Sequence, residues 1–231
     1  MTIDVETADT LDPPLSYPGY KSTTPRAPKL ATIAAPPGEA ERAGPVFGDT
    51  SVAATEADLT QQAVQAPLGE RIVVSGRVLD SDSRPVRDAL VEIWQANAAG
   101  RYAHQRDDHD APLDPGFVGA GRCRTGPDGS YRFVTVKPGA YPWQNHHNAW
   151  RPAHIHFSLF GTGFVNRLVT QMYFPDDPLF PFDPIFNSIP DPEARKRLIS
   201  SFDLDTTEPE WALSFRWDIV LRGRRSTPME D

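Results

Sequence analysis

The chain has 231 residues, of which 24 are proline, and it carries a formal net charge of −8. Proline removes a backbone donor and fixes φ, so this content excludes a helical bundle or a coiled coil. The acidic balance disfavours binding to the phosphate backbone of nucleic acids, and no apolar run approaches the ~20 residues of a membrane span. The N-terminus lacks a secretory signal. We therefore expect no nucleic-acid partner, no membrane insertion and a cytoplasmic location.

Residues 1–69 are predicted to form an extended N-terminal arm that packs on the core or on a partner chain. Residues 1–50 contain eight of the prolines and show no sustained hydrophobic periodicity. The tracts 17–20 and 44–47 carry apolar anchors, which favour a packed arm. The polar stretch 56–65 is predicted to hold one short helix.

Residues 70–231 are predicted to form one folded domain. Apolar and β-branched runs between turn signals predict strands at 71–79, 89–94, 131–136, 153–160, 168–174 and 213–221. The last run has five large apolar residues at period two. A single helix is predicted over 191–199, with Asp191 as its N-cap and Pro192 in its first turn. The pattern indicates a mainly β protein, an antiparallel β-sandwich with an extended proline-rich N-terminal arm and one or two short helices.

All six histidines lie between residues 104 and 156, and two of them form a His-x-His motif. On a strand, His154 and His156 share one face, so both rings could reach one metal ion. Two unrelated, hydrogen-bonded histidines would give the same pattern, and both interpretations remain open. Cys123 is the only cysteine, which excludes an intrachain disulfide and a thiolate zinc site, and we expect it in a strand or in the core.

Tyrosines are candidate oxygen donors beside these histidines. Tyr141 lies in a turn-rich connection before His154, and Tyr102 follows Gly100-Arg101. A phenolate is a hard anionic donor that suits iron(III). Taken alone, each tyrosine is better explained as a half-buried aromatic with a hydrogen-bonded hydroxyl group. Arg151 could stabilise an anion near the metal, although a surface ion pair is the more common arrangement.

The blocks at 90–97, 100–102, 111–115, 141–143, 150–156 and 170–174, in this order and spacing, resemble the intradiol ring-cleavage dioxygenases. The resemblance runs from about residue 20 to 224 and is strongest to the branch that acts on protocatechuate. It implies one non-haem iron(III) per chain, held by Tyr102, Tyr141, His154 and His156. In the family pattern Tyr141 is the displaceable axial ligand, and its Tyr-Pro turn is predicted to lie outside any rigid ladder.

The resemblance also implies the remaining site residues and partners. Arg151 would stabilise charge on the substrate ring, and Gln171 would lie beside the substrate. Tyr20, Trp143 and Ile185 would line the substrate pocket, so that the arm completes the site of a catalytic domain at 70–231. The implied reaction cleaves protocatechuate with O2 to 3-carboxy-cis,cis-muconate, in aromatic catabolism by the β-ketoadipate pathway. A related α chain would complete a hetero-oligomer.

Two alternatives remain. The same chemistry could act on catechol or hydroxyquinol, but those relatives commonly have a helical N-terminal region in place of a proline-rich arm. A non-catalytic, transthyretin-like β-sandwich binding module would share the strand pattern but would not need the four ligands. The histidines outside the motif are expected in solvated loops without a ligand role; these are His104, His109, His146 and His147.

Overall fold

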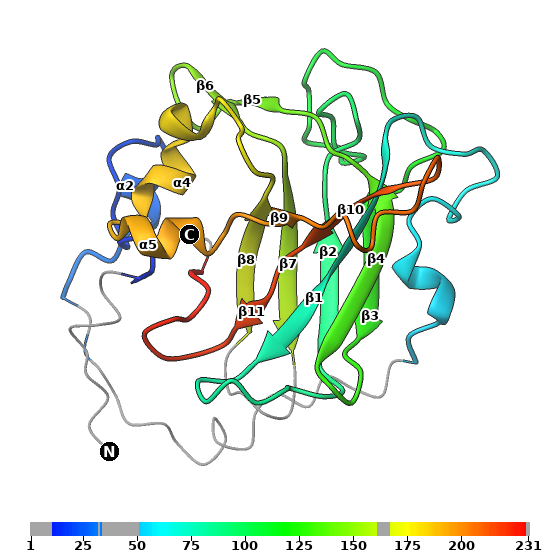
Figure 1. Cartoon of the computed structure of the whole chain (residues 1–231). Coiled ribbons are helices and arrows are strands. Elements are labelled where there is room, and N and C mark those ends of the chain that lie inside the picture. The colour runs from blue at the N-terminus through cyan, green and yellow to red at the C-terminus, as the bar shows by residue number, and fades with distance from the viewer. Residues whose placement is uncertain (1–10, 32, 34–50, 161–166, 230–231) are drawn as a thin grey trace.

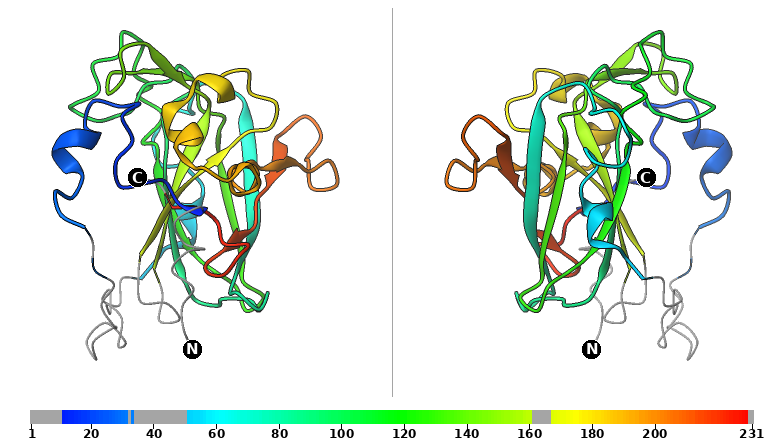
Figure 2. Two further views of the ribbon diagram at one scale, coloured as in Figure 1. Left: turned by 90° about the vertical axis from the view of Figure 1, so that its left-hand side faces the viewer. Right: turned by 90° about the vertical axis from the view of Figure 1, so that its right-hand side faces the viewer.

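Two β-sheets packed face to face form the body of the protein (Figures 1 and 2), for which a computed structural model describes residues 11–31, 33, 51–160 and 167–229. The first sheet contains β1 (Arg71–Leu79), β4 (Ser130–Val136), β9 (Ser201–Phe202), β10 (Leu213–Arg216) and β11 (Ile219–Val220). The second has the order β3 (Ala120–Arg124), β2 (Leu90–Trp94), β7 (His154–Phe160) and β8 (Leu168–Tyr173). A separate ribbon pairs β5 (Tyr141–Trp143) with β6 (Ala149–Arg151).

The core fills the space between the two sheets. Phe157 of β7 lies 6.3 Å from Phe133 of β4 and 4.9 Å from Trp217, measured between ring centroids. All three side chains are buried. Aromatic rings at these separations add edge-to-face attraction to the burial of apolar area. These contacts hold the two sheets together and fix the position of β7 relative to the first sheet.

The predicted β-sandwich is confirmed, and its strands depart from the expectation in one respect. The first sheet is mixed, because β1 pairs antiparallel with β4 but parallel with β10 and β11. The strand expected over 213–221 is interrupted at Trp217 and Asp218. The Trp217 carbonyl oxygen lies against Gly76, where a Cβ would meet it at 1.7 Å, and it accepts a hydrogen bond from the Tyr131 hydroxyl. The Asp218 carboxylate accepts the Arg77 N–H in place of a backbone carbonyl.

Four short strands were not expected from the sequence: β3, β5, β6 and β9. In β5, Tyr141 pairs with Arg151 of β6. The expectation that Tyr141 lies in a turn outside a ladder is therefore wrong. The Tyr-Pro sequence removes only one backbone donor, and a strand that pairs on one edge tolerates that loss.

Short helices cover the β8 side of the sandwich (Figure 1). They are α2 (Thr23–Arg26), α4 (Pro184–Ser188), α5 (Pro192–Lys196) and the 3₁₀ turn η2 (Phe180–Phe182); a further 3₁₀ turn, η1 (Ala54–Ala57), lies apart from them. The helix expected at 191–199 is present but ends at Lys196, and the Asp191 side chain accepts the Glu193 N–H as an N-cap. The helix expected at 56–65 is wrong, because only the end of η1 overlaps that stretch. None of the described helices is long and apolar enough to cross a membrane.

The described part of the N-terminal arm packs on the folded domain. The backbone N–H groups of Lys21 and Ser22 donate to the carbonyl and side-chain oxygens of Asn145, at 2.7 and 2.8 Å. Asp12 accepts the Met229 N–H at 2.8 Å. Tyr20 is 3% exposed. The tract 44–47 lies outside the described residues, and the boundary at residue 69 remains a prediction.

Candidate active site

The two histidines of the His-x-His motif lie side by side on β7. Their ring centroids are 4.9 Å apart, and both side chains are buried. Ile155 and Phe157, which alternate with them, face the core between the sheets and are fully buried. The alternation of the strand thus directs the imidazoles away from the hydrophobic core and towards the β5–β6 ribbon.

Two tyrosine hydroxyls meet these imidazoles. Tyr102 Oη lies 3.1 Å from His156 Nε2, and Tyr141 Oη lies 3.3 Å from His154 Nε2. The two tyrosine rings are 5.4 Å apart and nearly perpendicular. Three separate parts of the chain therefore bring two phenol oxygens and two imidazole nitrogens to one place.

The protonation of His154 follows from its surroundings. Its Nδ1 lies 2.7 Å from the Pro152 carbonyl oxygen, which can only accept, so Nδ1 carries the proton and Nε2 keeps a lone pair. Burial, and next the charge of Arg151, lower the pKa of His154 well below its usual range. A neutral imidazole that donates its distal N–H to a carbonyl is the form that ligates metal ions.

The chemistry of the donor set fits iron(III). Within the described part of the chain, no group of three or more His, Cys, Asp and Glu side chains is arranged to hold a metal ion. A metal at this place would therefore need the tyrosine oxygens. Two phenolates and two neutral imidazoles offer two negative charges and hard oxygen donors, which match a trivalent cation.

Arg151 lies next to the donors and is held on both sides. It is 1% exposed. Its Nε and Nη2 donate to the two carboxylate oxygens of Asp183 at 3.2 and 3.0 Å, a bidentate pair. Its Nη1 lies 3.2 Å from His154 Nε2 and donates to Tyr141 Oη at 3.4 Å. Burial, the largest single influence, lowers the pKa of Arg151, but the Asp183 carboxylate together with Tyr173 and Tyr141 more than offsets it, so the pKa lies well above its usual range. The guanidinium is a permanent, fixed positive charge.

Gln171 and Tyr173 complete this network from β8. The register places Gln171 opposite His156, and Tyr173 opposite His154. Gln171 Oε1 accepts from Arg151 Nη2 and lies 3.0 Å from the Tyr173 hydroxyl. Gln171 Nε2 is buried and has no hydrogen-bond partner in the described chain. A buried donor without an acceptor is costly, so this N–H favours a hydrogen bond to an oxygen atom of a bound group.

A cavity of about 450 Å³ opens beside the donors. Its lining includes Tyr102, Tyr141 and His156, together with the Trp143 side chain. Tyr20 and Ile185 are not among its lining residues. Tyr20 packs edge-on against Trp143 with ring centroids 5.2 Å apart, while Ile185 lines a small separate cavity with Gln171. The structure thus brings Trp143 to the cavity and places Tyr20 behind it.

Sequence reasoning missed three residues of this region. Asp183 and Tyr173 hold Arg151, and the Trp94 ring stacks on the His156 imidazole with ring centroids 4.8 Å apart at 3°. The only sequence signal for Asp183 is its position before Pro184, which indicates an N-cap. Asp183 does cap α4, since its Oδ1 accepts the Ile185 N–H. Nothing in that signal distinguishes an exposed cap from a buried counter-ion.

The other histidines and the cysteine have different surroundings. His104 and His109 line the rim of the cavity, and the His146 and His147 rings are 4.1 Å apart in a loop next to it. Cys123 lies on β3, where burial raises the pKa of its thiol to about 11. It therefore stays protonated at neutral pH.

Comparisons with known proteins agree with this geometry. The family model described as "Dioxygenase" matches residues 42–223. The chain is 59% identical to the protocatechuate 3,4-dioxygenase beta chain of Burkholderia cepacia, over 94% of this chain and 93% of that one. It is 32% identical to the alpha chain from the same organism, over 71% and 78%. The crystal structure of 3-chlorocatechol 1,2-dioxygenase from Rhodococcus opacus superposes with a TM-score of 0.58 at 25% identity, covering 77% of this chain and 70% of that one.

The chain belongs to the intradiol ring-cleavage dioxygenase family, as its motifs predict. Members of this family use non-haem iron.

Proposed function

We propose that this chain is the iron-bearing chain of an enzyme that cleaves protocatechuate between its two hydroxylated carbons. Both atoms of O2 enter the product, 3-carboxy-cis,cis-muconate. The observation that carries the proposal is the convergence of two tyrosine oxygens and two imidazole nitrogens beside the buried Arg151. The 59% identity to a protocatechuate 3,4-dioxygenase beta chain supports the substrate. Dioxygenases for catechol and hydroxyquinol match at 31–37% identity, over 47–62% of this chain.

One Fe(III) per chain would be held by Tyr102, Tyr141, His154 and His156. When bound, ferric iron would supply a Lewis acid that favours deprotonation of the catechol hydroxyl groups and an electron acceptor that makes the resulting catecholate reactive towards O2. The protein fixes the donors through neighbouring contacts. The Pro152 carbonyl orients the His154 ring, and the Trp94 ring stacks on the His156 imidazole and restricts its tilt. Such contacts set the tautomer and the direction of each donor before the metal binds.

Arg151 would stabilise the negative charge that develops on the substrate ring. Its guanidinium is buried, permanently charged and fixed by Asp183, so it does not need to reorganise when charge appears. Gln171 Nε2 would donate to an oxygen atom of the bound reactants, because its own Oε1 is occupied and its N–H has no partner. These two groups supply a positive charge and a directed donor on the same side of the site.

Tyr141 would be the donor that leaves when substrate binds. The β5–β6 ribbon that carries it has three residue pairs and joins neither main sheet. A short two-stranded ribbon is marginally stable by itself, so the Tyr141 side chain can move at low cost while Asp183 keeps Arg151 in place. Arg151 Nη1 already lies within 3.4 Å of Tyr141 Oη and could keep that contact as the tyrosine turns.

The substrate ring would lie along Trp143. The cavity of about 450 Å³ is within the range of small-ligand pockets. Tyr20, in the arm, packs against the Trp143 ring. Ile185 lies two residues after Asp183, the counter-ion of Arg151, and donates its backbone N–H to the Asp183 carboxylate. This arrangement supports a pocket built from both parts of the chain, 1–69 as arm and 70–231 as catalytic domain.

A related α chain would complete the enzyme as a hetero-oligomer. The beta- and alpha-chain relatives from one organism, at 59% and 32% identity, support this partner. Two large aromatic side chains are exposed on contacting elements: Trp150 of β6 at 46% and Phe182 of η2 at 68%. Exposed aromatic side chains beside a site are typical of protein interfaces. A cytoplasmic location remains the prediction of the sequence.

Oxygen uptake tests the proposed reaction. The iron-loaded chain, alone and co-purified with the α chain, would be given protocatechuate, catechol and hydroxyquinol in turn. We expect the αβ complex to consume one O2 per protocatechuate and to act on that substrate with the highest kcat/KM. Preference for catechol or hydroxyquinol would overturn the substrate, and absence of O2 uptake with all three would overturn the function.

A further inference from the structure

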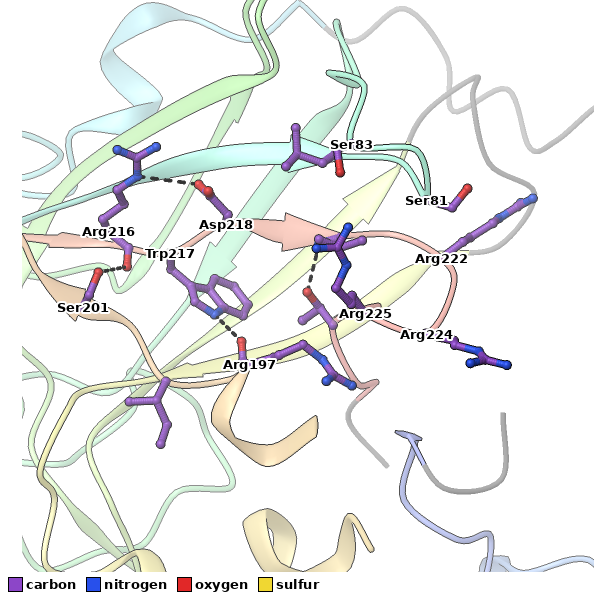
Figure 3. A pocket seen from close by; sticks show the side chains of 14 residues that line it. Ser81, Ser83, Arg197, Ser201, Arg216, Trp217, Asp218, Arg222, Arg224 and Arg225 are labelled. Carbon is purple, nitrogen blue, oxygen red and sulfur yellow. Dashed lines mark hydrogen bonds and ion pairs between the residues drawn. The ribbon is translucent and has the colours of Figure 1, made fainter. Parts of the chain in front are cut away.

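A second cavity lies where four segments of the chain meet (Figure 3). They are the end of β1 with the turn that follows it, the segment after α5, the β10–β11 region and the C-terminal segment. The cavity has a volume of about 570 Å³ and shares no lining residue with the candidate active site. The Trp217 ring and Ile199 form apolar parts of its wall, and Ser81, Ser83 and Ser201 add hydroxyl groups.

Positive charge is concentrated around this cavity. Five arginines line it: Arg197, Arg216, Arg222, Arg224 and Arg225. Asp218 is the only carboxylate among the described lining residues, and it already accepts the Arg77 N–H at 2.9 Å. Its pairing with Arg216 is long, at 3.8 Å. A chain with a net charge of −8 thus places a local excess of positive charge in one concave place.

Three of these arginines have no ion pair within the described part of the chain: Arg222, Arg224 and Arg225. The loop that carries them is closed by two reciprocal hydrogen bonds. Thr227 N–H donates to the Val220 carbonyl at 2.8 Å, and Val220 N–H donates to Thr227 Oγ1 at 3.0 Å. Gly223, at φ +90°, turns the chain within this loop. The backbone therefore fixes the loop from which the three exposed arginine side chains extend at the edge of the cavity, and their charges have no ion-pair partner among the described residues.

The hydrogen bonding of Arg197 is a second feature of this cavity, separate from its excess of positive charge. Its Nε donates to the Ser226 carbonyl at 2.9 Å, and its own carbonyl accepts the Trp217 indole N–H at 2.8 Å. Its Nη2 is nevertheless buried without any hydrogen-bond partner in the described chain. A buried guanidinium nitrogen without an acceptor carries an unrecovered desolvation cost. An acceptor that is not part of the described chain would remove that cost.

We infer that this cavity is a binding site for a small multivalent oxyanion that carries carboxylate or phosphate groups. Guanidinium groups match both kinds of oxyanion by bidentate hydrogen bonds. Arg197, anchored by its bond to the Ser226 carbonyl, places a guanidinium group in the wall, the three arginines of the loop supply charge at the rim, and the serine hydroxyls supply neutral donors. The Trp217 wall accommodates the carbon skeleton of a polycarboxylate, whereas a phosphate would use the polar side alone.

Isothermal titration of the iron-loaded chain distinguishes the two kinds of anion. The probes are tricarballylate, with three carboxylates, and inorganic phosphate, each at 50 mM and at 500 mM NaCl. We expect at least one probe to bind with Kd below about 1 mM at low salt. The variant R224Q/R225Q should bind that probe at least about tenfold more weakly, and high salt should weaken binding in the parent chain.

The control variant is R87Q/R132Q, which removes two exposed arginines outside the cavity and changes the net charge by the same amount. It should bind within about twofold of the parent chain. Equal weakening in both double variants would show a general charge effect and overturn the site, as would absence of binding of both probes. The visible spectrum of bound iron is recorded in the same titration, and a spectral change on anion binding would place the anion at the iron and overturn the proposal.

Discussion

Two regions of this molecule treat the positive charge of arginine in opposite ways. Beside the candidate iron site, Arg151 is buried and meets a bidentate carboxylate, a tyrosine hydroxyl and an amide oxygen. Around the second cavity, Arg222, Arg224 and Arg225 are exposed and have no ion pair within the described residues. The first arrangement fixes one charge in one direction, as catalysis requires. The second keeps several charges available, as the capture of an anion requires.

The comparison predicts its largest effect on stability at Asp183. The variant D183N leaves the Arg151 charge buried without a counter-ion, and removal of one partner from a buried pair costs about 3–5 kcal/mol. Asparagine can still accept the Ile185 N–H as the N-cap of α4, so the variant removes the negative charge without removing the cap. The matched control is D191N, which keeps the equivalent cap of α5 at a position without a buried partner. Urea unfolding should place D191N within about 0.5 kcal/mol of the parent chain, and equal losses in both variants would contradict the account.

Arg151 itself should matter more for turnover than for folding once Asp183 is also neutral. In R151Q/D183N no unpaired charge remains, so stability should recover relative to D183N. Turnover of the iron-loaded enzyme should stay about 10²–10³-fold below that of the parent chain, because the fixed charge that stabilises the developing anion is absent. Normal turnover in this double variant, at full iron content, would remove Arg151 from the proposed mechanism.

The exposed arginines should show the smallest effect on stability. R224Q/R225Q removes two charges that have no folded-state partner among the described residues, so the free energy of unfolding should change by no more than about 0.5 kcal/mol. Urea unfolding at low and high salt measures it. A loss of more than 2 kcal/mol would show that these arginines support the fold and would erase the contrast with Arg151.

The sequence predicted what depends on local pattern. Period-two runs such as 71–79 predicted the strands correctly, and the Asp191-Pro192 pair predicted the start of α5. Strand β3 was missed because its sequence, Ala-Gly-Arg-Cys-Arg, has no β-branched residue and is only partly buried. The prediction of a turn at Tyr141 is wrong because β5 pairs along one edge only, and a proline next to Tyr141 does not prevent such pairing.

Burial and long-range pairing could not be predicted in the same way. Asp183 has the sequence signal of an ordinary helix cap, yet it is the buried counter-ion of a residue 32 positions away. The interruption of the 213–221 strand depends on the close approach of Gly76 and on the Tyr131 hydroxyl, both distant in sequence. For the candidate metal donors, the motifs gave the residues, and the structure adds the contacts of 3.1 and 3.3 Å within the two tyrosine–histidine pairs.

The most direct test of the central proposal is the iron content and visible spectrum of Tyr102→Phe beside those of Tyr131→Phe. Tyr131 is a buried tyrosine whose hydroxyl group donates a hydrogen bond to the Trp217 carbonyl, away from the site. We expect one iron per chain and a tyrosinate-to-iron(III) absorption band in the parent chain and in Tyr131→Phe, with iron and band lost or strongly reduced in Tyr102→Phe. Full iron content with an unchanged band in Tyr102→Phe, or a colourless parent chain at full iron content, would contradict the ligand set.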